Sequence, residues 1–190
     1  VPPVFVDSFR IGTGSAHGVE AAARWLPGAW NLGFSYSLLF AERRAGEDVF
    51  PPRFERRHEL DATVERQWGI HGLLSARLVV ASGQPVTPAL GMTEAFQFDP
   101  EQGSWQGGLP RSLRGDHNAA RLPGYLRLDV AARRSFERRW FGREGTITPY
   151  FQVINALNTK NALVAKTHWS YPTYTPQLPL LPTFGIEWRF

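Results

Sequence analysis

The sequence predicts an all-β fold of about seven or eight antiparallel strands that cross a membrane as strands of a β-barrel. Three observations predict it. Apolar and polar residues alternate with period two in at least six segments. These segments are longer than the strands of soluble proteins, which usually have about 5 to 6 residues. Short connections alternate with long ones along the chain.

Composition excludes several other classes of protein. The chain has 190 residues, a formal net charge of +4 carried mostly by arginine, and no cysteine, so disulfides and thiolate metal sites are excluded. Its apolar runs are far shorter than the roughly 18 residues that a membrane-spanning helix needs. The single methionine is Met92, and no signal peptide begins the sequence. We therefore expect a mature or truncated piece of a longer protein.

The first two alternating segments flank a tight turn at Leu26-Pro27-Gly28. In residues 18–25 the apolar positions are Val19, Ala21, Ala23 and Trp25, opposite Glu20, Ala22 and Arg24. From Asn31 to Phe40 they are Leu32, Phe34, Tyr36, Leu38 and Phe40. Each segment therefore predicts a strand with one apolar face and one polar face. The preceding residues 12–17, with Gly12, Gly14 and His17, are expected to form a turn.

The next two segments flank a second tight turn at Gly69-Ile70. Residues 58–68 place Leu60, Ala62, Val64 and Trp68 on one face and Glu59, Asp61, Thr63, Glu65 and Gln67 on the other. Residues 71–80 alternate less clearly, because Leu73 and Val79 interrupt the polar face. We expect a pair of strands here as well.

Three further segments complete the pattern. Residues 125–136 oppose Leu126, Leu128, Val130, Ala132 and Phe136 to Arg127, Asp129, Ala131, Arg133 and Ser135. Residues 145–153 oppose Ile147, Phe151 and Val153 to Thr146, Thr148, Tyr150 and Gln152. The final segment, 183–190, alternates Phe184, Ile186, Trp188 and Phe190 with Gly185, Glu187 and Arg189. These segments predict the last strands of the sheet.

The connections separate a membrane barrel from a soluble β-sandwich, which alternation alone does not. Residues 26–28, 69–70 and 140–144 are short, whereas 45–53, 84–121 and 159–180 are longer and rich in turn-forming residues. Short turns at one end and long loops at the other are typical of outer-membrane barrels. Aromatic residues beside the short turns are expected to form an interfacial girdle: Trp25, Trp30, Trp68, Phe136 and Trp140.

The order and spacing of several segments resemble the C-terminal barrel strands of TonB-dependent outer-membrane receptors. The segments are GSAHGVEAAARWLPGAWNLGFSYSLLFAERR, SGQPVTP, RLPGYLRLDVAARRSF, YFQVINALNTKNA and LPLLPTFGIEWRF. The resemblance implies that residues 1–190 are the C-terminal part of such a barrel, in a Gram-negative outer membrane, with the plug domain absent from this chain. It also implies uptake of a siderophore, cobalamin or saccharide.

The resemblance further implies partners and one recognition element. The partners are outer-membrane lipid, the barrel assembly machinery and, in the full-length receptor, an N-terminal plug domain and TonB. The alternating residues of the last strand resemble the signal that the assembly machinery recognises: Phe184, Ile186, Trp188 and Phe190.

Other chemistry is not predicted. The five histidines lack the spacing of a metal site, no serine is marked as a nucleophile, and neither a cofactor nor nucleic acid is expected, so the chain is not predicted to be an enzyme. The polar loop with Arg114, Asp116, His117 and Asn118 is a possible ligand contact or a solvated loop. The charges on the polar faces are expected to form an ion-pair network: Glu59, Asp61, Glu65, Arg77, Arg127, Asp129, Glu187 and Arg189.

Two alternative folds are compatible with the alternation. One is a complete small eight-stranded barrel with a structural or adhesion role, and the other is a soluble β-sandwich. Pairing of the first strand with the last would favour the small barrel, whereas a curved sheet with unpaired edges would favour a segment of a larger one.

Overall fold

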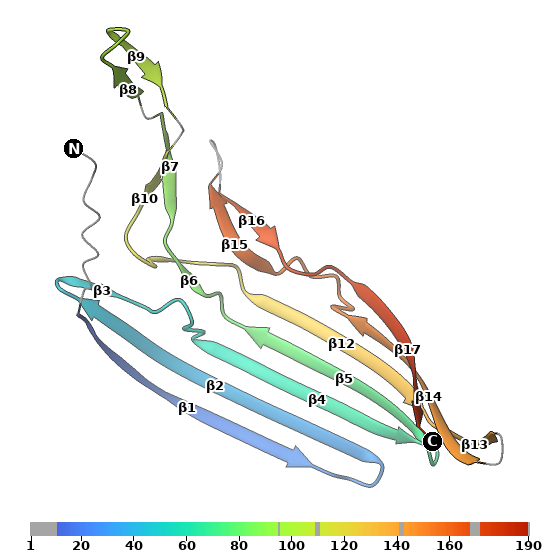
Figure 1. Cartoon of the computed structure of the whole chain (residues 1–190). Helices are drawn as coiled ribbons and strands as arrows, with labels where there is room; N and C mark the ends of the chain where they lie inside the picture. Colours follow the sequence, from blue (N-terminus) through green and yellow to red (C-terminus); the bar gives the residue numbers. More distant parts are fainter. Residues whose placement is uncertain (1–10, 95, 109–110, 141–142, 168–171, 190) are drawn as a thin grey trace.

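A computed structural model describes residues 11–94, 96–108, 111–140, 143–167 and 172–189 and shows an all-β, antiparallel chain. Long strands form one sheet in which neighbours in sequence are neighbours in space (Figure 1). They are β1 (Thr13–Trp25), β2 (Trp30–Ala45), β4 (His58–Trp68), β5 (Gly72–Ala81), β12 (Tyr125–Arg134), β14 (Arg143–Ile154) and β17 (Leu181–Arg189). β3 (Asp48–Phe50) pairs with the last residues of β2. β13 (Phe136–Trp140) follows β12 and pairs with the first half of β14. The predicted antiparallel strands are confirmed.

The strand register confirms the two predicted faces. Leu32, Phe34 and Tyr36 of β2 pair with Val64, Ala62 and Leu60 of β4, so apolar residues stand beside apolar ones. Asn31 and Ser35 pair with Glu65 and Asp61 on the other face. The same parity continues through β5, β12, β14 and β17. We call the two sides the apolar face and the polar face.

The connections divide between the two ends of the sheet as predicted. Residues 26–29 and 69–71 join strands at the end that we call the turn end; β13 ends and β14 begins there, and β17 runs towards it (Figure 1). Residues 46–57 and the described parts of the connections from β5 to β12 and from β14 to β17 lie at the opposite, loop end. The loops contain the short strands β6 (Pro85–Val86), β7 (Ala89–Thr93), β8 (Phe96–Asp99), β9 (Ser104–Gly107), β10 (Arg111–Arg114), β11 (Ala120–Arg121), β15 (Ala162–Thr167) and β16 (Pro172–Pro176).

The expected turn before the first strand is wrong. Residues 13–17 belong to β1, where Thr13 pairs with Arg44 and His17 pairs with Phe40. Gly14 therefore lies in an extended strand, because the long β2 supplies a partner for every residue of β1. Pairing with a neighbouring strand has overridden the local turn preference of glycine.

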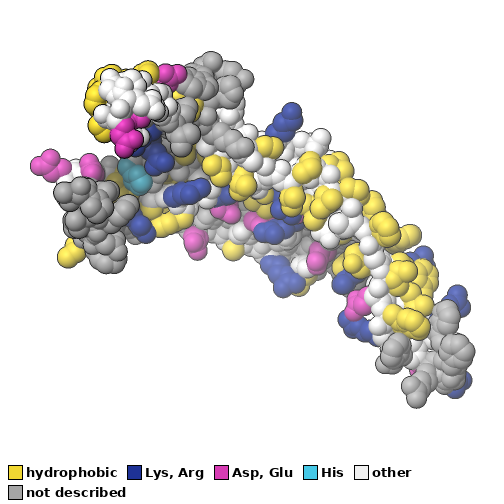
Figure 2. All heavy atoms as spheres, turned by 45° about the horizontal axis from the view of Figure 1, so that its top comes forward, with side chains coloured by type: hydrophobic (Ala, Val, Ile, Leu, Met, Phe, Trp, Pro, Cys, Tyr) yellow, Lys and Arg dark blue, Asp and Glu magenta, His cyan; other side chains and the backbone are white. Residues whose placement is uncertain are grey.

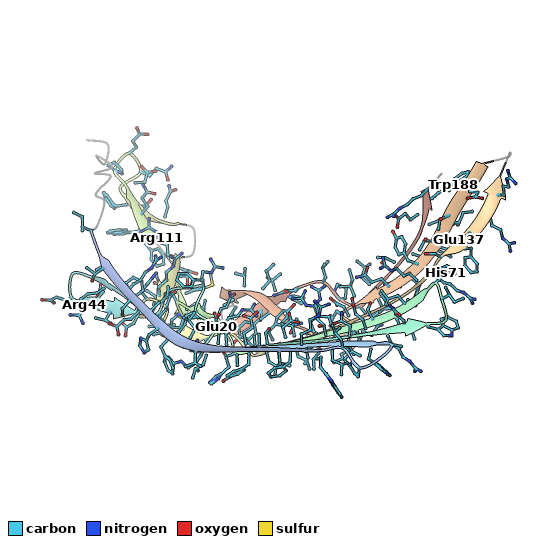
Figure 3. All side chains as sticks on the ribbon, turned by 90° about the horizontal axis from the view of Figure 1, so that it is seen from below. Glu20, Arg44, His71, Arg111, Glu137 and Trp188 are labelled. Atoms are coloured by element: carbon cyan, nitrogen blue, oxygen red, sulfur yellow. The ribbon has the colours of Figure 1, made fainter. Side chains whose placement is uncertain are left out.

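The sheet is curved, and its polar face lies on the inner side of the bend. Figure 3 shows this curvature and places Glu20 on the inner side. β1 and β17 are the outer strands of the sheet, and no ladder joins them in the residues that the structure describes. The pairing that would favour a complete small barrel is therefore not found there. No described helix is long and apolar enough to cross a membrane.

Hardly any apolar side chain is buried in this sheet. Among the described residues, the only hydrophobic one classed as buried is Ala81, which is 5% exposed. Phe184 is 85% exposed, and Trp25 and Ile186 are also largely uncovered. A β-sandwich would bury such a face against a second sheet, whereas here the apolar face has no second layer. The described residues therefore form no hydrophobic core of the kind that a soluble domain has.

A proline accounts for the interruption between β12 and β13. Arg133 pairs with Tyr150 and Phe136 pairs with Ile147, so the register is the same on both sides of the gap. The gap lies opposite Pro149, which has no backbone N–H to donate. Ser135 donates its own backbone N–H to the carbonyl of His71, and its hydroxyl lies 2.9 Å from that of Thr148. Side chains and the neighbouring turn thus bridge the break.

Gly185 gives room to the ring of Tyr150, and we expect Gly185→Ala to destabilise this pair of strands. The two residues pair across β14 and β17, and a Cβ on Gly185 would lie 2.4 Å from the Tyr150 hydroxyl oxygen. The ring must shift, at a cost of about 1 to 3 kcal/mol. A double-mutant cycle with Tyr150→Ala tests this cause, because the penalty of Gly185→Ala should largely vanish once the ring is gone. An unchanged penalty would contradict the steric explanation.

Candidate functional site

The polar face carries paired charges, as the ion-pair prediction required. Arg77 of β5 donates from Nε to the carboxylate oxygens of Asp61 on β4 at 2.9 and 3.2 Å. Arg189 donates to Glu187, two residues earlier on β17, at 2.7 Å. Figure 2 shows acidic and basic side chains mixed along the molecule and not separated by sign. Because these pairs are half-exposed, each contributes about 0 to 1 kcal/mol to stability.

A hydrogen-bonded chain crosses three strands near the turn end. Arg24 of β1 donates to the side-chain oxygen of Asn31 at 2.9 Å, and Asn31 donates to Glu65 of β4 at 2.7 Å. An amide side chain has both a donor and an acceptor. Asn31 therefore links the guanidinium of Arg24 to the carboxylate of Glu65. This chain fixes the relative positions of β1, β2 and β4 on the polar face.

Asp129 connects the middle of β12 with the third long loop. Its carboxylate accepts hydrogen bonds from Arg127 at 2.8 and 2.7 Å and from the backbone N–H of Asn155 at 2.9 Å. Asn155 is 1% exposed, and its side chain binds the backbone of Thr159 and Leu178. The loop thereby folds back over the end of β14.

Asn161 replaces a missing strand beside β12. Its side-chain amide donates to the carbonyl of Leu126 at 2.8 Å and accepts from the backbone N–H of the same residue at 2.9 Å. These two bonds satisfy backbone groups that β14 no longer reaches, because β14 pairs with β12 only from Val130 onwards. A hollow of about 410 Å³ lies beside this contact and is lined by residues that include Tyr125, Arg127, Leu163 and Pro176.

A buried carboxylate joins the first two long loops. Glu55 is completely buried, and its oxygens accept hydrogen bonds from Arg57 at 3.3 Å and from Arg121 at 2.5 Å. Arg121 also donates to the carbonyl of Gly83 at 3.1 Å. Burial raises the pKa of the Glu55 carboxyl, but the hydrogen bonds and positive charges of Arg121 and Arg57 outweigh it, so the pKa lies below its ordinary value.

We expect this loop cluster to weaken in acid. A lowered folded-state pKa means that the contribution of Glu55 is complete above the ordinary glutamate pKa of about 4.3 and is lost as the pH falls through the lowered value. Glu55→Gln should reduce local stability by about 1.5 to 3 kcal/mol at neutral pH and remove this pH dependence. Hydrogen exchange of residues 51–57 and 82–88 measures both effects. Glu47→Gln, an exposed glutamate in the same loop, is the control; a pH profile unchanged in Glu55→Gln would contradict the assignment.

The four residues proposed for the ligand loop have different environments. Arg114 and Asp116 are exposed, and Arg114 ends β10. His117 lies against Phe50, with the ring centres 4.4 Å apart, and 3.4 Å from the Thr87 hydroxyl. Asn118 is buried and donates to the carbonyl of Pro51 at 2.8 Å. Asn118 therefore holds two loops together, while Arg114, Asp116 and His117 remain accessible; ligand contact by this loop stays a prediction.

Sequence reasoning missed Glu55, Asn155 and Asn161, which are three of the four buried polar residues in the described part of the chain. No three described His, Asp or Glu side chains are arranged to hold a metal ion. Comparisons with protein-family models, curated proteins and solved structures found no match. The role of the polar face accordingly rests on its own chemistry, which is that of a mixed-charge surface with several paired arginines.

The last strand, β17, has a continuous row of apolar side chains on the apolar face. Phe184, Ile186 and Trp188 pair with Phe151, Pro149 and Ile147, and all three lie on the apolar face. Phe190, the fourth residue of the predicted assembly signal, lies outside the described residues. The side chain of Trp140 also lies outside the described side chains. The other aromatic residues of the predicted girdle lie on the apolar face at the turn end, and Trp188 lies with them: Trp25, Trp30, Trp68 and Phe136.

Proposed function

We propose that this chain forms an arc of an outer-membrane β-barrel of the TonB-dependent receptor type and takes part in ligand uptake. One observation carries the proposal: a single curved sheet has an uncovered apolar face on one side and a charge-paired polar face on the other. Apolar patches on soluble monomers rarely exceed a few hundred Å². Lipid is the solvent that would cover a face that extends over all the long strands.

The dimensions of the strands support the same proposal. A tilted strand of about 9 to 11 residues crosses the hydrocarbon layer, and the long strands here have 9 to 16 residues. In this arrangement the short turns mark one side of the membrane and the long loops the other. The interruptions of alternation by Arg66 and Arg134 lie near the turn end, where a long side chain reaches the headgroups.

The curvature and the unpaired edges support a segment of a large barrel. Unpaired strand edges favour aggregation, and closure with further strands removes them. Barrels of 22 strands enclose a plugged lumen, and the polar face of this arc would line such a lumen. The paired carboxylates and arginines would then face the plug or a passing ligand, while the long loops would receive the ligand from outside.

Quenching of tryptophan fluorescence tests the membrane assignment. Two variants of the protein, each with Phe in place of all tryptophans but one, would keep either Trp68 on the apolar face or Trp105 on the β8–β9 hairpin; both rings are exposed. In vesicles, bromine-labelled acyl chains should quench Trp68 strongly, whereas aqueous acrylamide should quench Trp105. Equal acrylamide quenching of both, together with a monodisperse protein in the absence of detergent, would overturn the proposal.

A further inference from the structure

Three described arginines near the turn end have the parity of the apolar face, Arg66, Arg134 and Arg138, and aromatic rings contact the first two. The guanidinium of Arg66 lies 4.9 Å from the centre of the Trp30 ring. That of Arg134 lies 5.3 Å from the centre of Trp68 and 5.2 Å from that of Phe136. These distances are within the range of cation–π attraction. Both arginines are exposed, so their remaining N–H donors are available.

A glycine allows Arg134 to reach across a strand. Arg134 pairs with Gly72 of β5, and Gly72 pairs with Trp68 of β4. A Cβ on Gly72 would lie 3.3 Å from the Cβ of Trp68 and 2.4 Å from its backbone oxygen. Because this position has no side chain, the guanidinium lies over an indole two strands away. The arrangement is built by three neighbouring strands.

Arg66 and Arg134 differ from three arginines of the polar face, which are paired with carboxylates. At the turn end, the described carboxylates follow the parity of the polar face: Glu65, Glu137, Glu144 and Glu187. Arg77, Arg127 and Arg189 are paired with carboxylates, but none of the ion pairs within the described residues includes Arg66 or Arg134. Arg66 and Arg134 therefore carry positive charges on an apolar face, and no described carboxylate forms an ion pair with either of them.

We infer that Arg66 and Arg134 bind the phosphate groups of anionic phospholipids in the leaflet that surrounds the short turns. This inference rests on the proposed function. An ionised group beside hydrocarbon is costly unless it finds a partner, and the planar guanidinium matches phosphate with two parallel hydrogen bonds. Two neighbouring apolar residues would contact acyl chains: Leu74, which pairs with Arg66, and Val64, two residues before Arg66 on β4. A phospholipid satisfies both the charge and this apolar surface, whereas free phosphate satisfies only the charge.

Spin-labelled lipids test the inference with the protein in phosphatidylcholine vesicles. Each site should favour phosphatidylglycerol over phosphatidylcholine by about fivefold, as expected for one arginine near an anionic lipid surface. The double variant Arg66→Gln/Arg134→Gln should lose this preference. Arg133→Gln is the matched control, because Arg133 lies next to Arg134 on the polar face, and it should keep the preference. A double variant that keeps it, or a control that loses it equally, would overturn the inference.

Two additional measurements separate the possible causes of failure. Quenching of Trp68 by bromine-labelled acyl chains reports insertion into the membrane. Absence of this quenching in the wild-type protein would contradict the proposed function. Normal quenching without a preference for phosphatidylglycerol would contradict only the arginine sites. Should the glutamine variant fail to insert, Arg66→Lys/Arg134→Lys keeps the charge and should retain a preference for phosphatidylglycerol; its absence in an inserted lysine variant would also overturn the inference. Inorganic phosphate in the buffer should not abolish the preference; if it does, the sites bind free phosphate.

Discussion

Arginine in place of Leu128 should lower the free energy of unfolding in a bilayer by about 2 to 4 kcal/mol. Leu128 lies on the apolar face in the same row as Leu78, Ala62 and Phe34, near the middle of the long strands. A guanidinium there would be far from either headgroup layer. Denaturant titration of the full-length protein in vesicles measures this decrease in the free energy of unfolding.

The matched control is Ala131→Arg, three residues further along β12 and on the polar face. Ala131 pairs with Ser75 and Gln152, so a new arginine would meet polar neighbours and should cost much less. Leu60→Arg and Thr63→Arg form a second pair of variants on β4. Leu60 lies one apolar row nearer the loop end than Leu128, so its penalty should be the smaller of the two lipid-face penalties. Similar penalties on both faces would contradict the inside and outside assignment.

Deletion of Phe190 should reduce the amount of protein in the outer membrane by more than the loss of one ring explains. Burying an aromatic side chain contributes about 1.5 to 3 kcal/mol, which is too little to unfold a large barrel. The apolar row of Phe184, Ile186 and Trp188 leads to this terminal residue. If the row is a recognition element for the assembly machinery, removing its end should block assembly before stability matters.

Phe151→Ala is the control for that deletion. Phe151 is half-exposed on the apolar face of β14, beside Phe184, so the substitution removes a comparable ring without altering the last strand. Quantitative blotting of outer-membrane fractions compares the two variants. Equal abundance would show that Phe190 contributes only packing, and the assembly role would then be wrong.

The period-two pattern was sufficient to predict the sheet and its faces. Alternation from Leu32 to Phe40 and from Leu126 to Ala132 is a property of each strand alone, so it can be read without a partner. Even the irregular strand β5 was interpreted correctly, since Leu73 and Val79 do lie on the polar face opposite Gln67 and Asp61. The short turns could also be predicted from neighbouring residues alone, because Gly28 and Gly69 adopt the positive φ that glycine favours.

The loops could not be predicted in the same way, because their order depends on residues far apart in the sequence. Glu55 binds Arg121, 66 residues later, and Asn161 binds Leu126, 35 residues earlier. Nothing in the residues around Glu55 distinguishes it from an exposed glutamate. The asparagines left a weak signal, since Asn155 and Asn158 are of the type that tolerates positive φ and folds tight turns. The error at residues 12–17 has a similar cause, because β2 decides the conformation of that segment.

The uncovered apolar face also determines how the protein can vary. In a packed core, trimming a leucine to alanine leaves a cavity among fixed neighbours, and enlarging a residue forces them apart. Phe184 and Ile186 have no facing layer, so neither a cavity nor a clash can form on their outer side. Substitutions there should alter stability only in proportion to the apolar area changed, about 25 cal/mol per Å². Apolar side chains of different shape can therefore replace one another on this surface, provided that they remain apolar. At Gly72 and Gly185, in contrast, a larger side chain would collide with its neighbours.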